Sequence, residues 1–168
     1  MSDIVLDTNV LADFIASYYK FEINVSGSFE EYKTISRFFA EKLNLINSNY
    51  KNYGVLQDGV IIASTFAFVE IARQFEKIAN KRFSIIQFRA FIESPPDWFI
   101  IYSLNEELFA YLNLLPSYVV MPGGNSLTLE WADTIHVATA LSRDEICLLA
   151  TTDGRLVNIV DIQKRLYL

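Results

Sequence analysis

Short apolar runs alternate along the chain with longer stretches in which apolar residues recur every three or four positions. The short runs favour buried strands, which we expect at residues 4–6, 60–63, 98–102, 146–150 and 156–160. The periodic stretches predict helices through about residue 19, over 32–46, from 65 onward, up to 115 and over 129–141. Alternating strands and helices imply parallel βαβ units, so we expect an α/β fold with a central, mainly parallel five-stranded sheet and helices on both of its faces.

Residues that cap helices stand before several of the predicted helices. They are Thr8, Asn9, Ser64, Thr65, Thr128 and the pair Ser103 and Glu106, which has the spacing of a capping box. Residues 118–121 fit either a short extra strand or a packed loop, and the pattern does not decide between them.

Size and composition fit one compact domain over residues 1–168. The chain has 52% hydrophobic and 20% charged residues. No apolar run reaches the length of a membrane span and no signal peptide is recognisable, so we expect a cytoplasmic protein. The single cysteine, Cys147, excludes an internal disulfide and a cysteine zinc site. A net charge of -6 argues against general attraction of nucleic acid, but it leaves room for a site whose positive charge comes from metal ions.

Four acidic residues occupy related places in the predicted elements. Asp7 and Asp153 each follow a buried strand, whereas Glu70 and Asp133 each lie in an early turn of a helix. Because strand C-termini and the N-termini of the following helices face the same edge in βαβ units, these carboxylates can converge. Two unit charges about 4 Å apart repel by roughly 4 kcal/mol at an effective dielectric near 20, so something cationic must offset them.

Hard divalent cations fit this need, since Mg²⁺ binds a few carboxylates together with waters and phosphate oxygens. A metal site of this kind activates a water for in-line displacement at phosphorus, which predicts phosphodiester hydrolysis. Other chemistries find less support. The chain has one histidine, so paired imidazoles are not available, and it has no G-x-S-x-G, G-x-x-x-x-G-K-[ST] or G-x-G-x-x-G motif.

Further candidates have two interpretations each. His136, one helical turn after Asp133, either contacts metal or phosphate or packs against the sheet. Glu130 either adds a fifth carboxylate or favours the helix end. The chain's one basic concentration is either a solvated face or a contact for phosphate, and it consists of Arg73, Lys77, Lys81, Arg82 and Arg89.

Four segments together resemble the motifs of a known family, the PIN-domain nucleases. Residues 4–11 (IVLDTNVL) resemble the opening motif and residues 65–70 (TFAFVE) the second acidic motif. Residues 132–140 (ADTIHVATA) are similar to the third motif and residues 151–153 (TTD) to the closing T-x-D. The order and spacing also resemble those of the family, from residue 4 to about 160.

The resemblance implies a three-layer α/β/α sandwich and cleavage of RNA with Mg²⁺ or Mn²⁺. It implies that Asp7, Glu70, Asp133 and Asp153 are the catalytic and metal-binding cluster, and that Thr8 or Asn9 and Thr151 orient it. Many small members, the VapC-like toxins, form homodimers and are inhibited by an antitoxin protein. Compared with a minimal toxin, this chain has extra material around residues 20–58 and 117–127.

We therefore expect a metal-dependent endoribonuclease with RNA as its substrate, and the likeness to VapC extends this expectation to the toxin of a toxin–antitoxin pair. Two alternatives stay open. One is a PIN-like binding or regulatory module without turnover, and the other is a structure-specific DNA nuclease that uses the same acidic site.

Overall fold

The computed structural model describes residues 3–20, 60–79, 81–97, 99–113, 115, 118–120, 123–143, 147–151 and 153–157. The helix expected over 32–46 lies outside these ranges, as does all of the segment 20–58 except its first residue.

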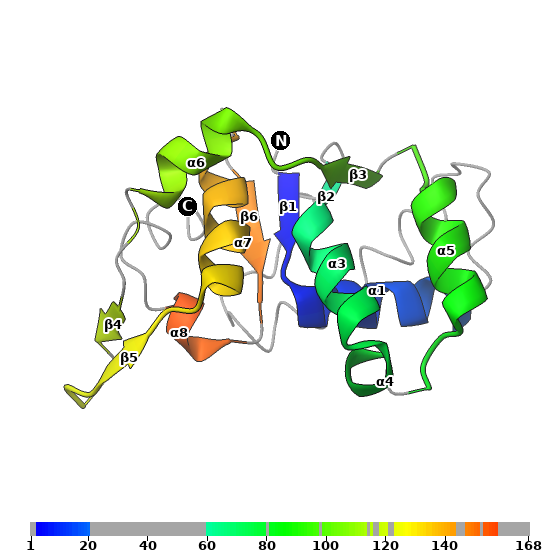
Figure 1. Cartoon of the computed structure of the whole chain (residues 1–168), viewed down its shortest axis with the longest axis horizontal. Helices are drawn as coiled ribbons and strands as arrows, with labels where there is room; N and C mark the ends of the chain where they lie inside the picture. Colours follow the sequence, from blue (N-terminus) through cyan, green and yellow to red (C-terminus); the bar gives the residue numbers. More distant parts are fainter. Residues whose placement is uncertain are drawn as a thin grey trace, which may run out of the picture.

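The protein has an α/β fold in which four strands form a parallel sheet in the order β3-β2-β1-β6 (Figure 1). The strands are β1 (Asp3–Leu6), β2 (Ile61–Ser64), β3 (Phe99–Tyr102) and β6 (Cys147–Ala150). In the central strand β1, Val5 pairs with Ile62 on one side and with Leu149 on the other. These four predicted strands are confirmed to within about one residue at each end, the usual spread of boundary assignments.

Helices flank the sheet. They are α1 (Thr8–Lys20), α3 (Thr65–Arg73), α4 (Phe75–Ile78), α5 (Ile85–Glu93), α6 (Glu106–Leu112), α7 (Trp131–Leu141) and α8 (Gly154–Val157). In Figure 1, α3 and α7 lie side by side across the sheet, and both helices contact β2. All six residues from Ile135 to Ala140 of α7 are buried, including the polar residues His136 and Thr139.

The fifth predicted strand, at residues 156–160, is wrong over the part that the structure describes. Asp153 turns the chain into the short helix α8: its side chain accepts a hydrogen bond from the backbone N–H of Arg155 at 2.9 Å, and its carbonyl accepts one from the N–H of Leu156 at 3.1 Å. Leu156 belongs to this helix and is buried. Its apolar side chain therefore reflects a buried helical position and not a strand. Residues 158–160 lie outside the described ranges.

Several helices begin one or two residues away from the expected cap. Ser64 caps α3 as predicted, with its hydroxyl accepting from the N–H of Ala67 at 3.2 Å. The cap of α6 is Asn105 instead of Ser103, since the Asn105 side chain accepts from the N–H of Leu108 at 2.9 Å. The N-cap position of α7 is Glu130, because Thr128 belongs to a strand.

Residues 118–120, where the pattern left a strand or a loop open, form a strand. β4 (Tyr118–Val120) pairs antiparallel with β5 (Ser126–Thr128) in a separate two-stranded sheet. Gly123 and Gly124 lie between these strands with φ angles of 106° and 86°, a backbone region that glycine adopts without a steric penalty.

Aromatic rings join α1, α5 and β3. The ring of Phe91 meets that of Phe99 edge to face at 4.9 Å, and Phe14 stacks on Phe99 at 5.4 Å. Such pairs contribute about 0.5–1.5 kcal/mol each beyond the area they bury. These contacts fix α1 against the sheet, and they thereby also fix the position of Thr8, the first residue of α1.

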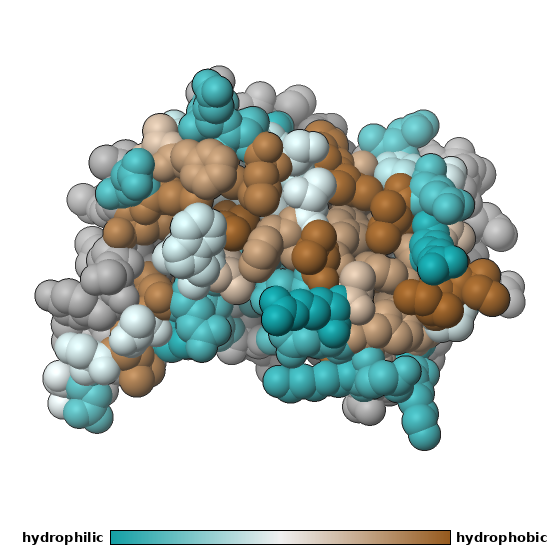
Figure 2. All heavy atoms as spheres, in the orientation of Figure 1, coloured by the Kyte–Doolittle hydropathy of each residue, from teal (hydrophilic) through white to brown (hydrophobic). Residues whose placement is uncertain are grey.

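Apolar side chains also remain on the surface. Among them are Val69, Ile86, Phe109 and Trp131. Figure 2 shows brown apolar surface over α3, α5 and α6, with hydrophilic side chains gathered near α4. No helix in the described ranges combines the length and the apolar composition that crossing a bilayer requires.

Candidate functional site

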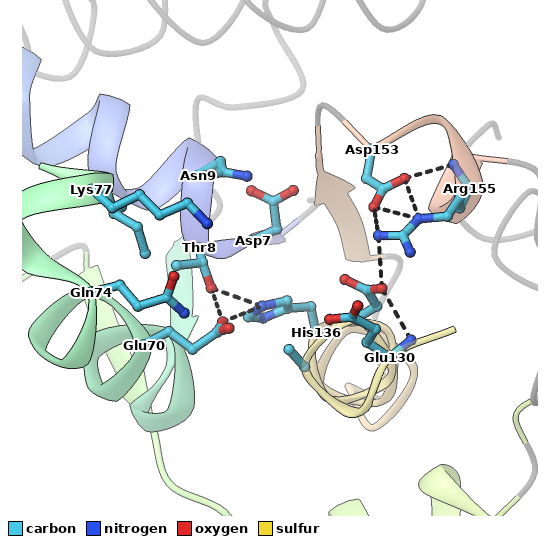
Figure 3. Close-up of a pocket in the computed structure, with 13 residues that line it drawn as sticks. Asp7, Thr8, Asn9, Glu70, Gln74, Lys77, Glu130, His136, Asp153 and Arg155 are labelled. Atoms are coloured by element: carbon cyan, nitrogen blue, oxygen red, sulfur yellow. Dashed lines mark hydrogen bonds and ion pairs between the residues drawn. The ribbon is translucent and has the colours of Figure 1, made fainter. Parts of the chain in front are cut away.

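The four acidic residues of the sequence motifs all line one cavity of about 390 Å³ (Figure 3). Asp7 follows β1, Asp153 follows β6, Glu70 comes from α3 and Asp133 from the first turn of α7. The cavity lies at the ends of β1 and β6, which are neighbours in the sheet. From β1 the strand order runs to β2 and β3 on one side, whereas β6 pairs with β1 on the other side, so this is the point at which the strand order reverses. Ligands bind at such switch points in open α/β sheets.

Asp7 is buried and fixed by three contacts. Its N–H donates to the carbonyl of Ala150 at 3.1 Å, its Oδ1 accepts from the N–H of Val10 at 2.8 Å, and its Oδ2 accepts from the hydroxyl of Thr151. Asp7 is therefore the residue that caps α1, a role that the sequence pattern gave to Thr8 and Asn9. Thr151 also accepts from the N–H of Asp153 at 3.0 Å, so one hydroxyl links the first and last motifs.

One end of the cavity, which we call the Glu70 side, consists of Thr8, Glu70 and His136. The hydroxyl of Thr8 donates to Oε2 of Glu70 and lies 3.1 Å from Nε2 of His136, which in turn is 3.6 Å from Oε2 of Glu70. Burial raises the pKa of Glu70, but the nearby imidazole of His136 and the hydrogen bond from Thr8 outweigh burial and leave the pKa below its usual value. Glu70 is thus kept as a carboxylate by its neighbours.

His136 packs deep in the molecule, with a side chain that is 3% exposed. Its Nδ1 has no hydrogen-bond partner among the described residues. A proton on Nδ1 would lack an acceptor, so the geometry favours the tautomer that carries its proton on Nε2, toward Thr8 and Glu70. Of the two interpretations of this residue, the structure favours a buried histidine, and one that also faces the cavity.

The opposite end, which we call the Arg155 side, consists of Asp133, Asp153 and Arg155. Nε of Arg155 lies 3.0 and 2.9 Å from the two carboxylate oxygens of Asp153. Nη2 of the same guanidinium contacts Asp153 and also lies 3.1 Å from Oδ2 of Asp133. Figure 3 shows the guanidinium of Arg155 beside the carboxylate of Asp153.

The two aspartates respond differently to this shared guanidinium. Hydrogen bonds from Arg155 lower the pKa of Asp153. Burial raises the pKa of Asp133, and the charge of Arg155 does not fully compensate. The N–H of Glu130 also donates to Oδ2 of Asp133 at 3.3 Å. Glu130 itself lines the cavity and is exposed.

Arg155 is the site residue that the sequence interpretation missed. The charge argument required a cation among the acids, and for Asp133 and Asp153 the structure supplies it from the chain itself. The sequence did contain a signal for this residue, the pattern Asp153-x-Arg155 after a predicted strand. An aspartate in a turn commonly bonds to the residue two positions later, so the side chain of that residue can fold back onto it. That Asp133 shares the guanidinium depends on tertiary packing and could not be read from spacing.

Of the basic residues proposed to contact RNA, Lys77 lines the cavity and Arg73 is exposed but does not. Arg82 is engaged elsewhere, since it pairs with Asp13 and donates to the carbonyls of Ile78 and Ala79. Asn9 is exposed at the cavity rim.

Five carboxylates line the cavity, and their oxygens are the ligands that Mg²⁺ and Mn²⁺ prefer. The donor chemistry therefore fits a hard divalent cation. The arrangement is incomplete, because within the described ranges no three such side chains surround one point closely enough to hold a metal ion. Comparison with protein-family models, curated proteins and solved structures finds no match for the chain.

Proposed function

We propose that the chain is a metal-dependent endoribonuclease of the PIN type. One observation carries this proposal: acidic residues from four separate motifs, Asp7, Glu70, Asp133 and Asp153, line a single cavity at the switch point of the sheet. In this proposal the parallel sheet is the centre of a three-layer α/β/α sandwich like that of the family the motifs resemble.

The four carboxylates are the residues that would hold Mg²⁺ or Mn²⁺. When bound, such an ion supplies a water of lowered pKa and stabilises charge on the leaving oxygen. The chain's own contribution is to keep the ligands oriented and ionised. Thr151 and the N–H of Val10 fix Asp7, while Thr8 and His136 fix Glu70. Lys77 at the rim is suited to a phosphate of the RNA backbone.

The most direct test uses a fluorescently labelled RNA and the substitution Asp7→Asn in the presence of Mn²⁺. The wild-type chain should cleave the RNA, and Asp7→Asn should reduce the rate at least about 100-fold, because even partners outside the metal's own ligands cost 10–100-fold when removed. Asp13→Asn is the matched control: it makes the same chemical change within α1, the helix that Asp7 caps, at a carboxylate that pairs with Arg82 and does not line the cavity. Circular dichroism verifies that both variants fold.

Undiminished cleavage by Asp7→Asn would contradict the mechanism, and absence of cleavage by the wild-type chain would contradict the activity. A DNA strand of the same sequence, run in parallel, tests the alternative of a DNA nuclease with the same four acids.

A second candidate function is a PIN-like binding or regulatory module without turnover. The observation that favours it is Arg155, because a guanidinium that already offsets Asp133 and Asp153 reduces their need for a metal ion. A chain that folds, binds RNA and does not cleave it at any Mn²⁺ concentration would support this candidate.

A further inference from the structure

Arg155 makes the closest set of charged contacts in the cavity. Its guanidinium engages both oxygens of Asp153 and one oxygen of Asp133, so that a single side chain joins residues from two different elements. A planar guanidinium matches a carboxylate with two parallel hydrogen bonds, which makes this pairing stronger than one through a single nitrogen.

The backbone of Arg155 is fixed, whereas its side chain can leave. Its N–H donates to Oδ1 of Asp153 at 2.9 Å, and the neighbouring Leu156 is buried. The side chain is 28% exposed, and among the described residues the further hydrogen bond of its guanidinium, beyond the two aspartates, is to the carbonyl of Thr128 at 3.5 Å. Rotation about side-chain bonds is therefore enough to move the guanidinium into solvent without unfolding α8.

The other basic residue of the cavity does not share this position. Lys77 comes from α4 and is exposed, and Figure 3 shows it on the part of the cavity near Glu70 and Gln74. Within the described residues, Asp133 and Asp153 have ion pairs with Arg155 alone.

We propose that Arg155 is the internal counter-ion of the cavity, that a divalent cation binds by displacing it, and that Arg155 thereby sets the affinity of the site for metal. This inference rests on the proposed function. The guanidinium and the metal compete for the same oxygens of Asp153, so the two do not occupy the site together. Displacement would also free the carboxylates of Asp133 and Asp153, which both contact the guanidinium, to turn toward a shared cation.

The test is the affinity of the full chain for Mn²⁺, measured by calorimetry or by the paramagnetic resonance of free Mn²⁺. Arg155→Gln removes the competing charge and should bind Mn²⁺ about ten-fold more tightly than the wild-type chain. Arg155→Lys retains the positive charge without the bidentate contact, and its affinity for Mn²⁺ should lie between those of the wild-type chain and Arg155→Gln. Arg82→Gln is the matched control, since it removes an Arg–Asp pair outside the cavity and should leave the affinity within about two-fold.

A second measurement follows the side chain itself. The ¹⁵N signal of the Arg155 Nε–H group, identified by its absence in Arg155→Gln, should shift and exchange faster with water on addition of Mg²⁺. The corresponding signal of Arg143, whose Nη2 lies 2.7 Å from Asp3, should not move.

The outcomes separate the two proposals. If the wild-type chain binds Mn²⁺ and Arg155→Gln binds it equally or more weakly, the displacement by metal is wrong and the proposed function stands. If neither chain binds Mn²⁺, the proposed function is wrong, and the role of Arg155 in setting metal affinity falls with it.

Discussion

The two sides of the cavity hold their carboxylates through different contacts. On the Glu70 side, the hydroxyl of Thr8 donates to the carboxylate of Glu70 and lies 3.1 Å from Nε2 of His136, and Thr8 and His136 are both buried. On the Arg155 side, two carboxylates share one guanidinium that is partly open to solvent. Buried hydrogen bonds are costly to break, whereas partly exposed ion pairs contribute little to stability. The Glu70 side is therefore a fixed part of the fold, whereas the contacts of the Arg155 side can exchange.

The largest difference between the two sides should appear in stability. His136→Ala removes a buried ring together with its hydrogen bonds, and should lower the free energy of unfolding by about 3 kcal/mol. Arg155→Gln should lower it by less than about 1 kcal/mol, because the pairs that it breaks are partly exposed and screened. Urea unfolding of the two variants, without metal, measures both values. If both variants lost the same free energy of unfolding, the two sides of the cavity would be equally fixed.

A smaller effect concerns pH. Thr8→Val removes a hydroxyl that keeps the pKa of Glu70 below its usual value of 4.5, and should cost about 1 kcal/mol at neutral pH. For a carboxyl whose pKa is lowered by folding, this stabilisation is present above pH 4.5 and disappears as the pH falls through the lowered pKa. The difference in the free energy of unfolding between the wild-type chain and Thr8→Val should therefore become smaller as the pH is lowered.

Thr139→Val is the matched control for this pH dependence. Thr139 is also buried, but its hydroxyl donates to the backbone carbonyl of Ile135 at 2.8 Å and not to a carboxylate. Its cost should not change with pH between neutral and acidic conditions. A constant cost for Thr8→Val as well would show that the hydroxyl does not act through the charge of Glu70.

Local sequence predicted the elements whose signals are local. The apolar runs ending at Leu6 and Ala150 gave two neighbouring strands, and the acids that follow them line one cavity. The run at 156–160 misled, because a short apolar stretch does not distinguish a strand from a buried helical turn and the hydrogen bonds of Asp153 decide the matter. The N-cap of α6 lies two residues after the predicted one, because Asn105 and Ser103 are both suitable capping residues and the local sequence does not choose between them.

The charge balance of the site could be predicted only in part. Convergence of carboxylates follows from βαβ topology, and so does the need for a cation. Which cation meets that need depends on contacts between Arg155 and Asp133, which come from α8 and α7 and meet only in the folded chain. The burial of His136 likewise reflects the packing of α7 against the sheet and α3, which sequence spacing does not specify.

The central claim is that the cavity binds a divalent cation through its carboxylates, and thermal unfolding of the full chain tests it most directly. Starting from metal-free protein, Mn²⁺ is added while the midpoint is followed by circular dichroism. We predict a rise of roughly 5 °C once Mn²⁺ exceeds its dissociation constant about 100-fold, and a clearly smaller rise for Asp7→Asn. An unchanged midpoint of the wild-type chain at millimolar Mn²⁺ would contradict the claim.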